Sequence, residues 1–134
     1  MIEYVGRRIN KCEAGCLEEH RLARARRGGD ASICAFVLNS RVDIDGGVPW
    51  NLAGPANHSC DPDCETRIIR GQIRIIALRD IGTGEEITYD YNFDWVLCRD
   101  HRCRCGASGC PGYIVRTDLR WRLRRRLARG QVAA

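Results

Sequence analysis

The sequence predicts a mainly β fold made of several small sheets with two peripheral helices. Three observations predict it: the strand-like apolar runs are short, irregular segments rich in glycine and proline separate them, and only two segments have a helical pattern. Short strands joined by irregular loops favour several small sheets over one large sheet. The 134 residues fit one domain, and an apolar content of 44% provides a modest core.

The first half of the chain contains an opening strand, a helix and a strand pair. Residues 2–9, IEYVGRRI, have the pattern of a strand. Residues 12–27 contain good helix formers and many charges, and the pair Gly28-Gly29 ends this helix. The β-rich run 32–39 can pair with residues 41–45 across a tight turn.

The second half begins with an irregular segment over residues 50–64. Residues 65–80 then predict a hairpin of two isoleucine-rich strands around Gly71. Residues 82–91, GTGEEITYDY, predict a turn and a short strand. The strands of this half are therefore short and closely spaced.

The C-terminal segment carries the basic charge of the chain. Residues 116–134 hold seven arginines and one acid, whereas the net charge of the whole chain is +5. A helix is predicted from about Asp118 with Thr117 as its cap, and it has a leucine every fourth residue, at Leu119, Leu123 and Leu127. Trp121 could anchor it. Either this is a docked helix with a solvated face, or it contacts nucleic acid or an acidic protein.

Cysteine is the most informative residue type in the chain. The chain has no run of 18 apolar residues and no signal-peptide pattern, so we expect no membrane span and no secretion. A cytoplasmic location is expected in a bacterium and a nuclear one in a eukaryote. Metal ligation is then favoured over disulfides for the nine cysteines, at positions 12, 16, 34, 60, 64, 98, 103, 105 and 110.

Three of these cysteines, Cys103, Cys105 and Cys110, form a C-x-C-x4-C motif. Zinc is held by four ligands in a tetrahedron, and three thiolates separated by glycines can wrap one ion. The alternative is a set of buried free thiols, but the interleaved arginine and glycine residues make a poor core. The candidates for a fourth ligand are Cys60, Cys64, Cys98 and His101.

A second grouping lies on the first predicted helix. Cys12, Cys16 and His20 share one face there. No further ligand lies nearby in the sequence, so ordinary packing with His20 at the edge is favoured over a metal site.

Three segments together resemble one family. NHSCDPDC (57–64), GEEITYDYNF (84–93) and CRCGASGCPGYIV (103–115), in this order, are similar to the SET-domain protein lysine methyltransferases with a post-SET zinc segment. The stretch EYVGRRI and the Asn51-Leu52-Ala53 approach to the first motif add to the resemblance, which spans residues 2–115.

The resemblance implies a SET-domain (β-clip-like) fold with a knot-like crossing. In that crossing, the segment from Asn57 to Cys60 threads next to the segment from Tyr89 to Tyr91. It also implies three consecutive parts: a SET domain over 1–97, a post-SET zinc segment over 98–115 and a basic C-terminal helix or tail over 116–134.

The resemblance further implies methyl transfer from S-adenosylmethionine to a lysine of a protein, such as a histone. Tyr91 would be catalytic, with its hydroxyl at the transfer point and near the cofactor, and Tyr89 would limit how many methyl groups fit. Asn57 and His58 would contact the cofactor. The alternatives are a core tyrosine at Tyr91, a turn-forming Asn57 and a histidine that only satisfies buried backbone groups.

The resemblance also selects Cys60 as the fourth zinc ligand, beside Cys103, Cys105 and Cys110. The zinc site would tie the post-SET segment to the active site as a wall of the lysine channel. Cys64 and Cys98 then remain as free thiols.

The sequence departs from the family pattern at two places. No Gly-x-Gly strand precedes Glu3-Tyr4-Val5-Gly6, and Gly54-Pro55-Ala56 replaces a basic residue followed by large apolar ones. These departures favour an alternative: a catalytically weakened, zinc-stabilised module that binds nucleic acid or protein. A strand edge left open would also suit a strand-exchanged homodimer.

Overall fold

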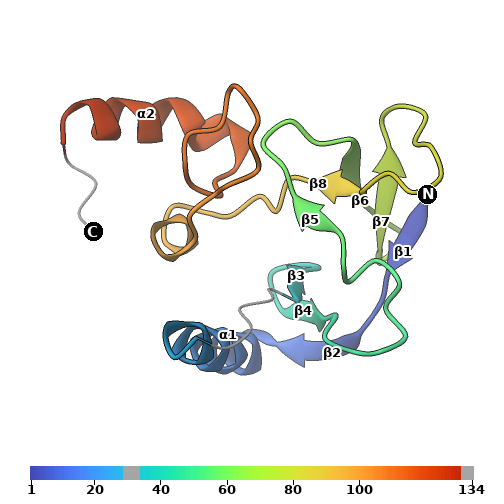
Figure 1. The fold of residues 1–134 in the computed structure, drawn as a ribbon. Coiled ribbons are helices and arrows are strands. Elements are labelled where there is room, and N and C mark those ends of the chain that lie inside the picture. Colours follow the sequence, from blue (N-terminus) through green and yellow to red (C-terminus); the bar gives the residue numbers. More distant parts are fainter. Residues whose placement is uncertain (29–33, 131–134) are drawn as a thin grey trace. The chain divides into compact units, whose positions relative to one another are not determined.

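The computed structural model of the chain describes residues 1–28 and 34–130. The chain forms two compact units (Figure 1), and each unit consists of two segments of the sequence. The first unit comprises Met1–Pro55 and Thr66–Ile76, and the second comprises Ala56–Glu65 and Ala77–Ala134. Gly29 of the predicted helix stop and the start of the predicted strand 32–39 lie outside the described residues.

The first unit contains a three-stranded sheet in the order β2-β4-β3, with all pairs antiparallel. Its strands are β2 (Arg7–Asn10), β3 (Ala35–Val37) and β4 (Val42–Asp45). Helix α1 (Lys11–Arg26) follows β2 directly, close to the predicted 12–27. Asn10 caps α1, since its side-chain oxygen accepts a hydrogen bond from the Glu13 amide at 2.9 Å.

The predicted single opening strand is wrong, because the chain forms β1 (Ile2–Tyr4) and β2 on either side of a break at Val5 and Gly6. β1 pairs with β7, whereas β2 pairs with β4. At Gly6 a Cβ atom would lie 2.1 Å from the carbonyl oxygen of Asp45, so only glycine fits this close backbone approach. The sequence pattern did not indicate that contact.

The predicted hairpin around Gly71 is confirmed. It consists of β6 (Cys64–Ile69) and β7 (Gln72–Ala77), with β1 antiparallel to β7 on its far side. Arg70 and Gly71 both have positive φ, 51° and 74°, as a tight two-residue turn requires. The inward residues Ile73 and Ile75 are each 1% exposed and contribute to the core of the first unit.

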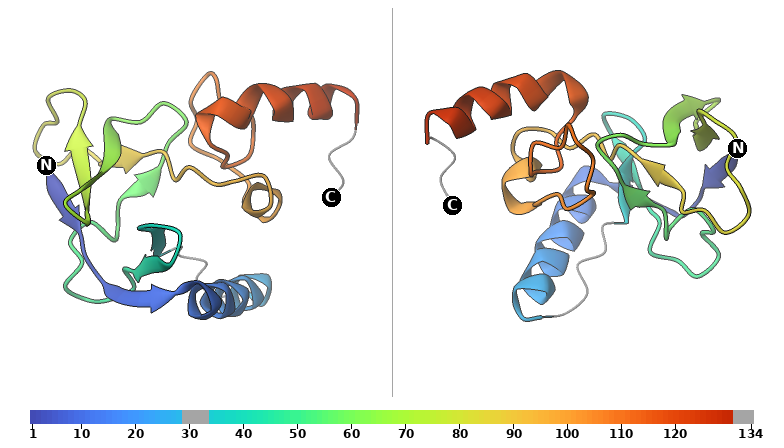
Figure 2. Two further views of the ribbon diagram at one scale, coloured as in Figure 1. Left: turned by 180° about the vertical axis from the view of Figure 1, so that it is seen from behind. Right: turned by 45° about the horizontal axis from the view of Figure 1, so that its top comes forward.

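The second unit contains the short strands β5 (Asn57–His58) and β8 (Thr88–Tyr89), which run side by side (Figure 1). After β8 the chain passes through the 3-10 turns η1 (Leu97–Asp100) and η2 (Thr117–Leu119) to α2 (Arg120–Ala128). Figure 2 shows this stretch coiled between β8 and α2. The core of the second unit consists of Cys98, Tyr113, Val115 and Leu123, with Trp95 and Leu119 packed against it.

The predicted start of the last helix needs two corrections. Thr117 does not cap α2: the helix begins after Leu119 with no side-chain cap, and the Thr117 hydroxyl instead donates a hydrogen bond to Asp90 at 3.1 Å. Trp121 is 57% exposed and therefore does not anchor the helix, a role that falls to the buried Leu123.

The predicted fold class is confirmed: the structure consists mainly of short strands in small sheets, with two α-helices among the described residues. Over residues 1–28 and 34–130, no helix is both long enough and apolar enough to cross a membrane.

Candidate functional site

The site is built around the parallel pairing of β5 with β8. Asn57 lies opposite Thr88 and His58 opposite Tyr89, and the Ser59 amide donates to the Tyr89 carbonyl at 3.2 Å. Each strand is only two residues long, so side chains from the irregular segments on either side of β5 and β8 can also reach the site. The adjacency predicted for these two segments is confirmed.

His58 lies at the centre of this pairing, with a side chain that is 4% exposed. Its Nδ1 accepts a hydrogen bond from the Tyr91 amide at 3.2 Å, which leaves the ring proton on Nε2. Nε2 lies 3.4 Å from the Cys60 sulfur and can donate to it. Burial lowers the pKa of His58, and Arg120 lowers it further, while Asp90 opposes both. The neutral ring therefore connects β8 to the cysteine segment.

Tyr91 follows β8 and is fixed at both ends. Its hydroxyl donates to the Ala56 carbonyl at 3.0 Å, just before β5. Its ring lies in a cluster of aromatic rings, with centroids 5.4 Å from His58, 4.9 Å from Tyr89 and 5.8 Å from Phe93. These contacts hold the phenol in one orientation beside the β5–β8 pair.

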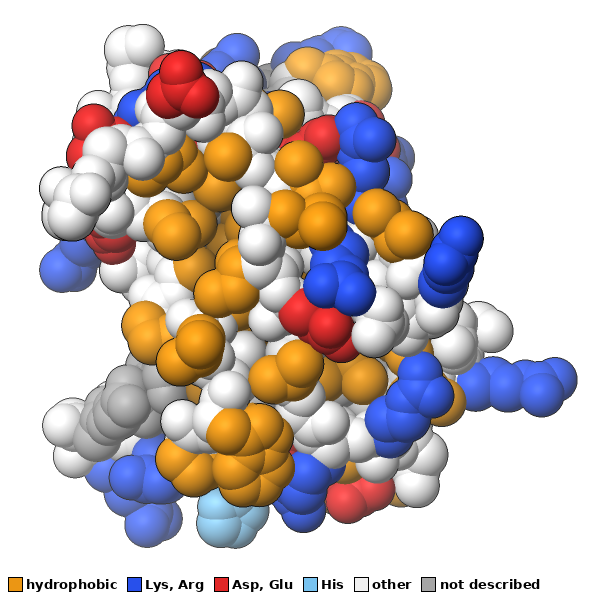
Figure 3. Space-filling view, turned by 90° about the vertical axis from the view of Figure 1, so that its right-hand side faces the viewer, with side chains coloured by type: hydrophobic (Ala, Val, Ile, Leu, Met, Phe, Trp, Pro, Cys, Tyr) orange, Lys and Arg blue, Asp and Glu red, His pale blue; other side chains and the backbone are white. Residues whose placement is uncertain are grey.

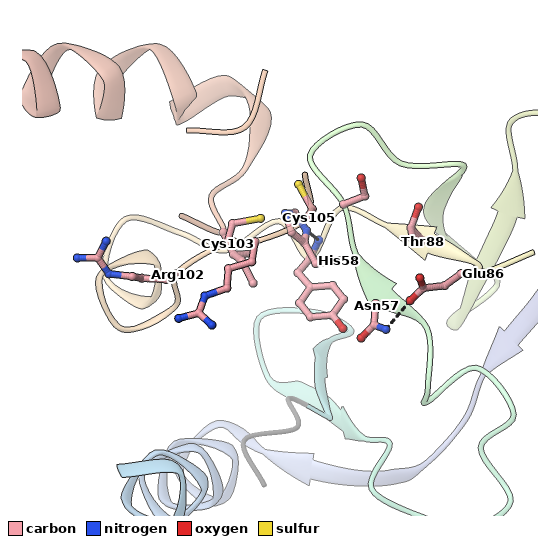
Figure 4. Close-up of a pocket in the computed structure, with 11 residues that line it drawn as sticks. Asn57, His58, Glu86, Thr88, Arg102, Cys103 and Cys105 are labelled. Atoms are coloured by element: carbon pink, nitrogen blue, oxygen red, sulfur yellow. Dashed lines mark hydrogen bonds between the residues drawn. The ribbon is translucent and has the colours of Figure 1, made fainter. Parts of the chain in front are cut away.

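A cavity of about 420 Å³ opens beside this pair (Figure 4). Asn57, Glu86 and Thr88 lie on one side of His58, and Arg102 comes from the cysteine-rich segment on the other side. The Asn57 amide donates to Glu86 at 2.5 Å. The volume is in the range of small-ligand sites, roughly 300–1,000 Å³.

The remaining lining of the cavity is mixed in character. Three of the predicted site residues, Asn57, His58 and Tyr91, line it, but Tyr89 does not: it is 6% exposed, and its ring centroid lies 4.9 Å from that of Tyr91. The other lining residues are Ser59, Arg104, Ile114 and two of the cysteines, Cys103 and Cys105. Sequence patterns did not identify Glu86, Arg102 or Arg104 as site residues, although the last two flank Cys103 in the motif.

The structure brings Cys60 together with Cys103, Cys105 and Cys110. Their four sulfur atoms all lie within 4.8 Å of one another, and the Cys60 and Cys103 sulfurs are 3.8 Å apart. A zinc ion with four thiolates at about 2.3 Å has sulfur–sulfur edges of about 3.8 Å. The donor set and its spacing therefore fit one tetrahedral metal ion.

The cluster favours removal of the first proton at Cys105. Burial acts against ionisation there, but the Cys60 and Ala107 amides and the neighbouring thiols donate to this sulfur, and the pKa falls to about 6. Burial and the thiol contacts raise the pKa of Cys103 to about 11 and raise that of Cys60 as well. A bound cation would favour the thiolate forms of Cys60 and Cys103, whose pKa values the metal-free cluster raises.

The other candidate ligands lie elsewhere. Cys98 is 1% exposed in the core of the second unit, where its thiol donates to the Trp95 carbonyl. Cys64 is buried at the start of β6, and His101 packs its ring on Phe93 with centroids 4.9 Å apart. None of the nine cysteines, all of which the structure describes, forms a disulfide.

The structure also tests the cysteine–histidine grouping predicted on α1. Cys12, Cys16 and His20 are exposed, so the favoured interpretation of ordinary packing is wrong for them. Within residues 1–28 and 34–130, the four-cysteine cluster is the one group of three or more cysteine, histidine or acidic side chains placed to hold a metal ion.

Arg120 connects α2 to the site, and sequence patterns missed it because they grouped every arginine of the last helix into one basic surface. Its guanidinium donates to the Cys60 carbonyl at 2.7 Å and to Asp90 at 2.8 Å. Both side chains of the Arg120–Asp90 ion pair are 13% exposed. Asp90 in turn lies 3.6 Å from Nδ1 of His58. One largely buried arginine, Arg120, thus holds the metal segment and the β8 segment together.

Comparison with known proteins shows which family the chain belongs to. The SET domain family matches residues 1–92, which include both strands of the pair. The chain belongs to the SET-domain family. The matched part of this SET domain ends before Cys103, so three of the four clustered cysteines lie beyond it.

Several fungal proteins are similar to this SET domain. Proteins named "Histone-lysine N-methyltransferase, H3 lysine-4 specific" are 40% identical in Candida albicans and 39% identical in Saccharomyces cerevisiae, in each case over 85% of this chain. The one in Aspergillus fumigatus is 38% identical over the same share. The chain spans only 9–11% of the length of these relatives.

Proposed function

We propose that this SET domain is a protein lysine N-methyltransferase that uses S-adenosylmethionine. The observation that carries the proposal is the position of Tyr91, whose hydroxyl lies next to the β5–β8 pair and whose residue lines the cavity. The family membership and the names of the fungal relatives support it. A lysine of histone H3, or of a similar basic protein, is the proposed acceptor.

Methyl transfer requires little covalent chemistry from the protein itself. S-adenosylmethionine supplies an activated methyl group on a sulfonium. A new bond to the lysine nitrogen forms as the sulfur–methyl bond breaks and its electron pair returns to sulfur. The protein must align the two partners and exclude water. The lysine ammonium, whose ordinary pKa is about 10.4, must first release a proton to solvent, and an aromatic, poorly solvated site favours that release.

We assign the following roles to the chain's own residues. Tyr91 orients the amine and stabilises the positive charge near its phenol oxygen. The side chain of Asn57 and the backbone around His58 bind the donor, which exchanges the present Asn57–Glu86 hydrogen bond for contacts with the ligand. Zinc is the metal proposed for the cysteine cluster, since four thiolates form a closed structural site.

Tyr89 is proposed to limit the number of methyl groups added. It packs against Tyr91, with ring centroids 4.9 Å apart, and is 6% exposed. Its hydroxyl would crowd a methylated amine, so the wild-type chain is expected to favour monomethylation. Tyr89→Phe is expected to shift the products toward di- and trimethyl-lysine, as read by mass spectrometry. An unchanged product distribution would contradict this role.

Calorimetric titration of the donor tests the proposed function. We expect S-adenosylmethionine to bind, and Asn57→Ala to weaken binding by about tenfold because one hydrogen bond to the ligand is removed. Asn39→Ala removes an amide that caps a turn in the first unit and should leave donor affinity unchanged. Absence of donor binding at millimolar concentration would contradict the enzyme proposal and favour the non-catalytic binding module.

The proposed division into a SET part (1–97), a post-SET part (98–115) and a basic helix (116–134) stays a prediction. So does the strand-exchanged homodimer, for which β1 offers one edge of its sheet. A monomeric mass in solution would contradict the dimer. The proposed compartment is the one that holds a basic protein substrate: the nucleus in a eukaryote or the cytoplasm in a bacterium.

A further inference from the structure

We propose that one face of helix α2 binds the phosphate backbone of nucleic acid without sequence preference. We call it the outer face and define it as Trp121, Arg122, Arg125 and Arg129. These residues follow helical spacing and therefore share one side of α2 and its C-terminal end. The inference goes beyond methyl transfer, since it concerns residues that do not line the cavity.

The arginines of this helix fall into two groups. Three of them hold the helix on its own unit: Arg120 donates to Cys60 and Asp90, Arg124 donates to the Gly109 carbonyl at 2.7 Å, and Arg126 stacks over Trp95 at 4.7 Å. Leu123, 1% exposed, packs between them into the core. The inner side of α2 is therefore already occupied.

The outer face carries the unused charge. Trp121, Arg122, Arg125 and Arg129 are all exposed. Within the described residues, the Arg122 and Arg129 side chains have no ion pair or hydrogen bond, and Arg125 contacts only the Trp121 ring, at 6.0 Å. A folded helix that presents three arginines and an exposed indole is suited to a partner with complementary charge and flat rings.

In the part of the chain that the structure describes, no acidic side chain neutralises this face. The one acid near the start of the helix, Asp118, is held by Arg116 at 2.7 Å, and Asp90 is held by Arg120. On the face of the molecule drawn in Figure 3, by contrast, hydrophobic side chains cover much of the surface and acidic side chains lie beside some of the basic ones. The outer face of α2 thus combines positive charge with an absence of competing carboxylates among residues 119–130.

Nucleic acid matches this chemistry better than an acidic peptide does. Arg122 and Arg129 are seven residues apart, which corresponds to about 10 Å along the helix and to roughly three phosphates of one strand. Guanidinium groups bind phosphate oxygens in a bidentate manner. The exposed Trp121 ring offers a surface on which an unpaired base can stack, which a carboxylate-rich peptide would not use.

The test is binding of the wild-type chain, without methyl donor, to a fluorescent DNA of about 20 nucleotides over a range of salt concentrations. We expect the triple variant Arg122→Gln, Arg125→Gln, Arg129→Gln to lower the salt dependence by about 0.9 in log–log slope for each phosphate that it no longer neutralises. Trp121→Ala should weaken binding to single strands more than to duplex, since only unpaired bases stack on the ring.

The matched control is a second triple variant, Arg24→Gln, Arg27→Gln, Arg41→Gln, which removes the same charge from exposed positions of the first unit. It should keep the wild-type affinity and slope. Equal weakening in both triple variants would overturn the proposal, because only net charge would then matter. Absent binding, binding insensitive to salt, or equally strong binding of polyglutamate would overturn it as well. Because no donor is present, these outcomes are independent of the methyltransferase proposal.

Discussion

At the scale of single residues, the site depends on two side chains, His58 and Arg120, that connect the cysteine segment to the Tyr91 segment. His58 accepts from the Tyr91 amide and points its other nitrogen at the Cys60 sulfur. Arg120 donates to the Cys60 carbonyl and to Asp90. Each of them bridges the cysteine segment and the Tyr91 segment, so the position of the phenol is coupled to the metal cluster.

Replacing Arg120 tests this coupling. Arg120→Met keeps the length of the side chain but removes the guanidinium that donates to the Cys60 carbonyl and to Asp90. Asp90 then keeps its weaker neutral donors, the Thr117 hydroxyl and the Asn92 amide. We expect the free energy of unfolding to fall by about 2–3 kcal/mol, since hydrogen bonds to charged groups contribute most. The metal affinity should also fall, as measured by competition with a chelator.

The matched control is Arg124→Met, which removes an exposed hydrogen bond to Gly109 and should cost at most about 1 kcal/mol. Arg120→Lys should recover part of the stability, because an ammonium can still reach one of the two acceptors. Equal effects of Arg120→Met and Arg124→Met would contradict a positioning role for Arg120.

At the scale of elements, the cysteine-rich segment has almost no regular structure of its own. It contains an isolated bridge between Arg102 and Tyr113, and Gly106 and Gly112 adopt positive φ within it. Such a segment is expected to depend on the metal for its order. Cys60, which follows β5 and Ser59, then ties it to the β5–β8 pair.

Two cysteine variants test this dependence. The wild-type chain is expected to bind one zinc ion, and Cys60→Ser should lower zinc affinity by more than about 100-fold, since even supporting residues cost about 10–100-fold. Cys64→Ser alters another buried thiol, but that thiol is not in the cluster, so zinc content should stay at the wild-type level. Elemental analysis after dialysis measures both. Loss of zinc from Cys64→Ser alone would contradict the assignment of the cluster.

The ion pairs of the three-stranded sheet in the first unit predict how the stability of the chain depends on pH. Asp45 at the end of β4 is 3% exposed and accepts from Arg7 at 2.7 Å and from Arg21 at 2.9 Å. Burial alone would raise the pKa of Asp45, but the hydrogen bonds from Arg7, Arg21 and the Gly47 amide outweigh it and lower the pKa below its ordinary value of 3.8.

A lowered pKa means that the unfolded chain takes up this proton more readily than the folded chain. The stability due to Asp45 is therefore fully present above its ordinary pKa and is lost as the pH falls through the lower folded value. Acid unfolding of Asp45→Asn should show a weaker pH dependence below about pH 4 than the wild type, whereas that of Glu19→Gln on the exposed face of α1 should not. An Asp45→Asn curve parallel to that of the wild type would contradict the ion-pair account.

Sequence patterns predicted those elements that depend on local chemistry. The hairpin around Gly71 and helix α1 were both expected near their observed positions, because turn residues and helix formers act over a few neighbours. The break at Gly6 was missed, since it depends on a backbone contact with the distant Asp45. The prediction that Thr117 caps α2 failed for a similar reason: its hydroxyl donates a hydrogen bond to the distant Asp90 instead.

The sequence predicted some residues of the candidate site but not others. The closeness of Cys60 to the other three cysteines followed from the family resemblance and could not be derived from spacing, which left four candidate ligands. Arg120 could not be found from the sequence, because nothing distinguishes it from the other arginines of its helix until its contact with Cys60 is seen. Long-range polar contacts are thus what the sequence alone did not reveal.

At the scale of the whole molecule, all residues placed in the candidate site belong to the second unit. That unit is assembled from Ala56–Glu65 and Ala77–Ala134. The short first segment carries Asn57, His58 and Cys60, and the second carries Tyr91 and the other three cysteines. The fold of this unit therefore brings the proposed donor contacts, the phenol and the metal ligands together.

The central claim is that Tyr91 acts at the point of methyl transfer, and its hydroxyl tests that claim most directly. The measurement is the rate of methyl transfer to a histone H3 peptide, followed by mass spectrometry with saturating donor, for Tyr91→Phe and for Tyr113→Phe as a buried tyrosine outside the cavity. We expect the wild type and Tyr113→Phe to methylate a lysine, and Tyr91→Phe to bind the donor but react about 100-fold more slowly, as when one stabilising hydrogen-bond group is removed. Equal rates for the wild type and Tyr91→Phe would contradict the account.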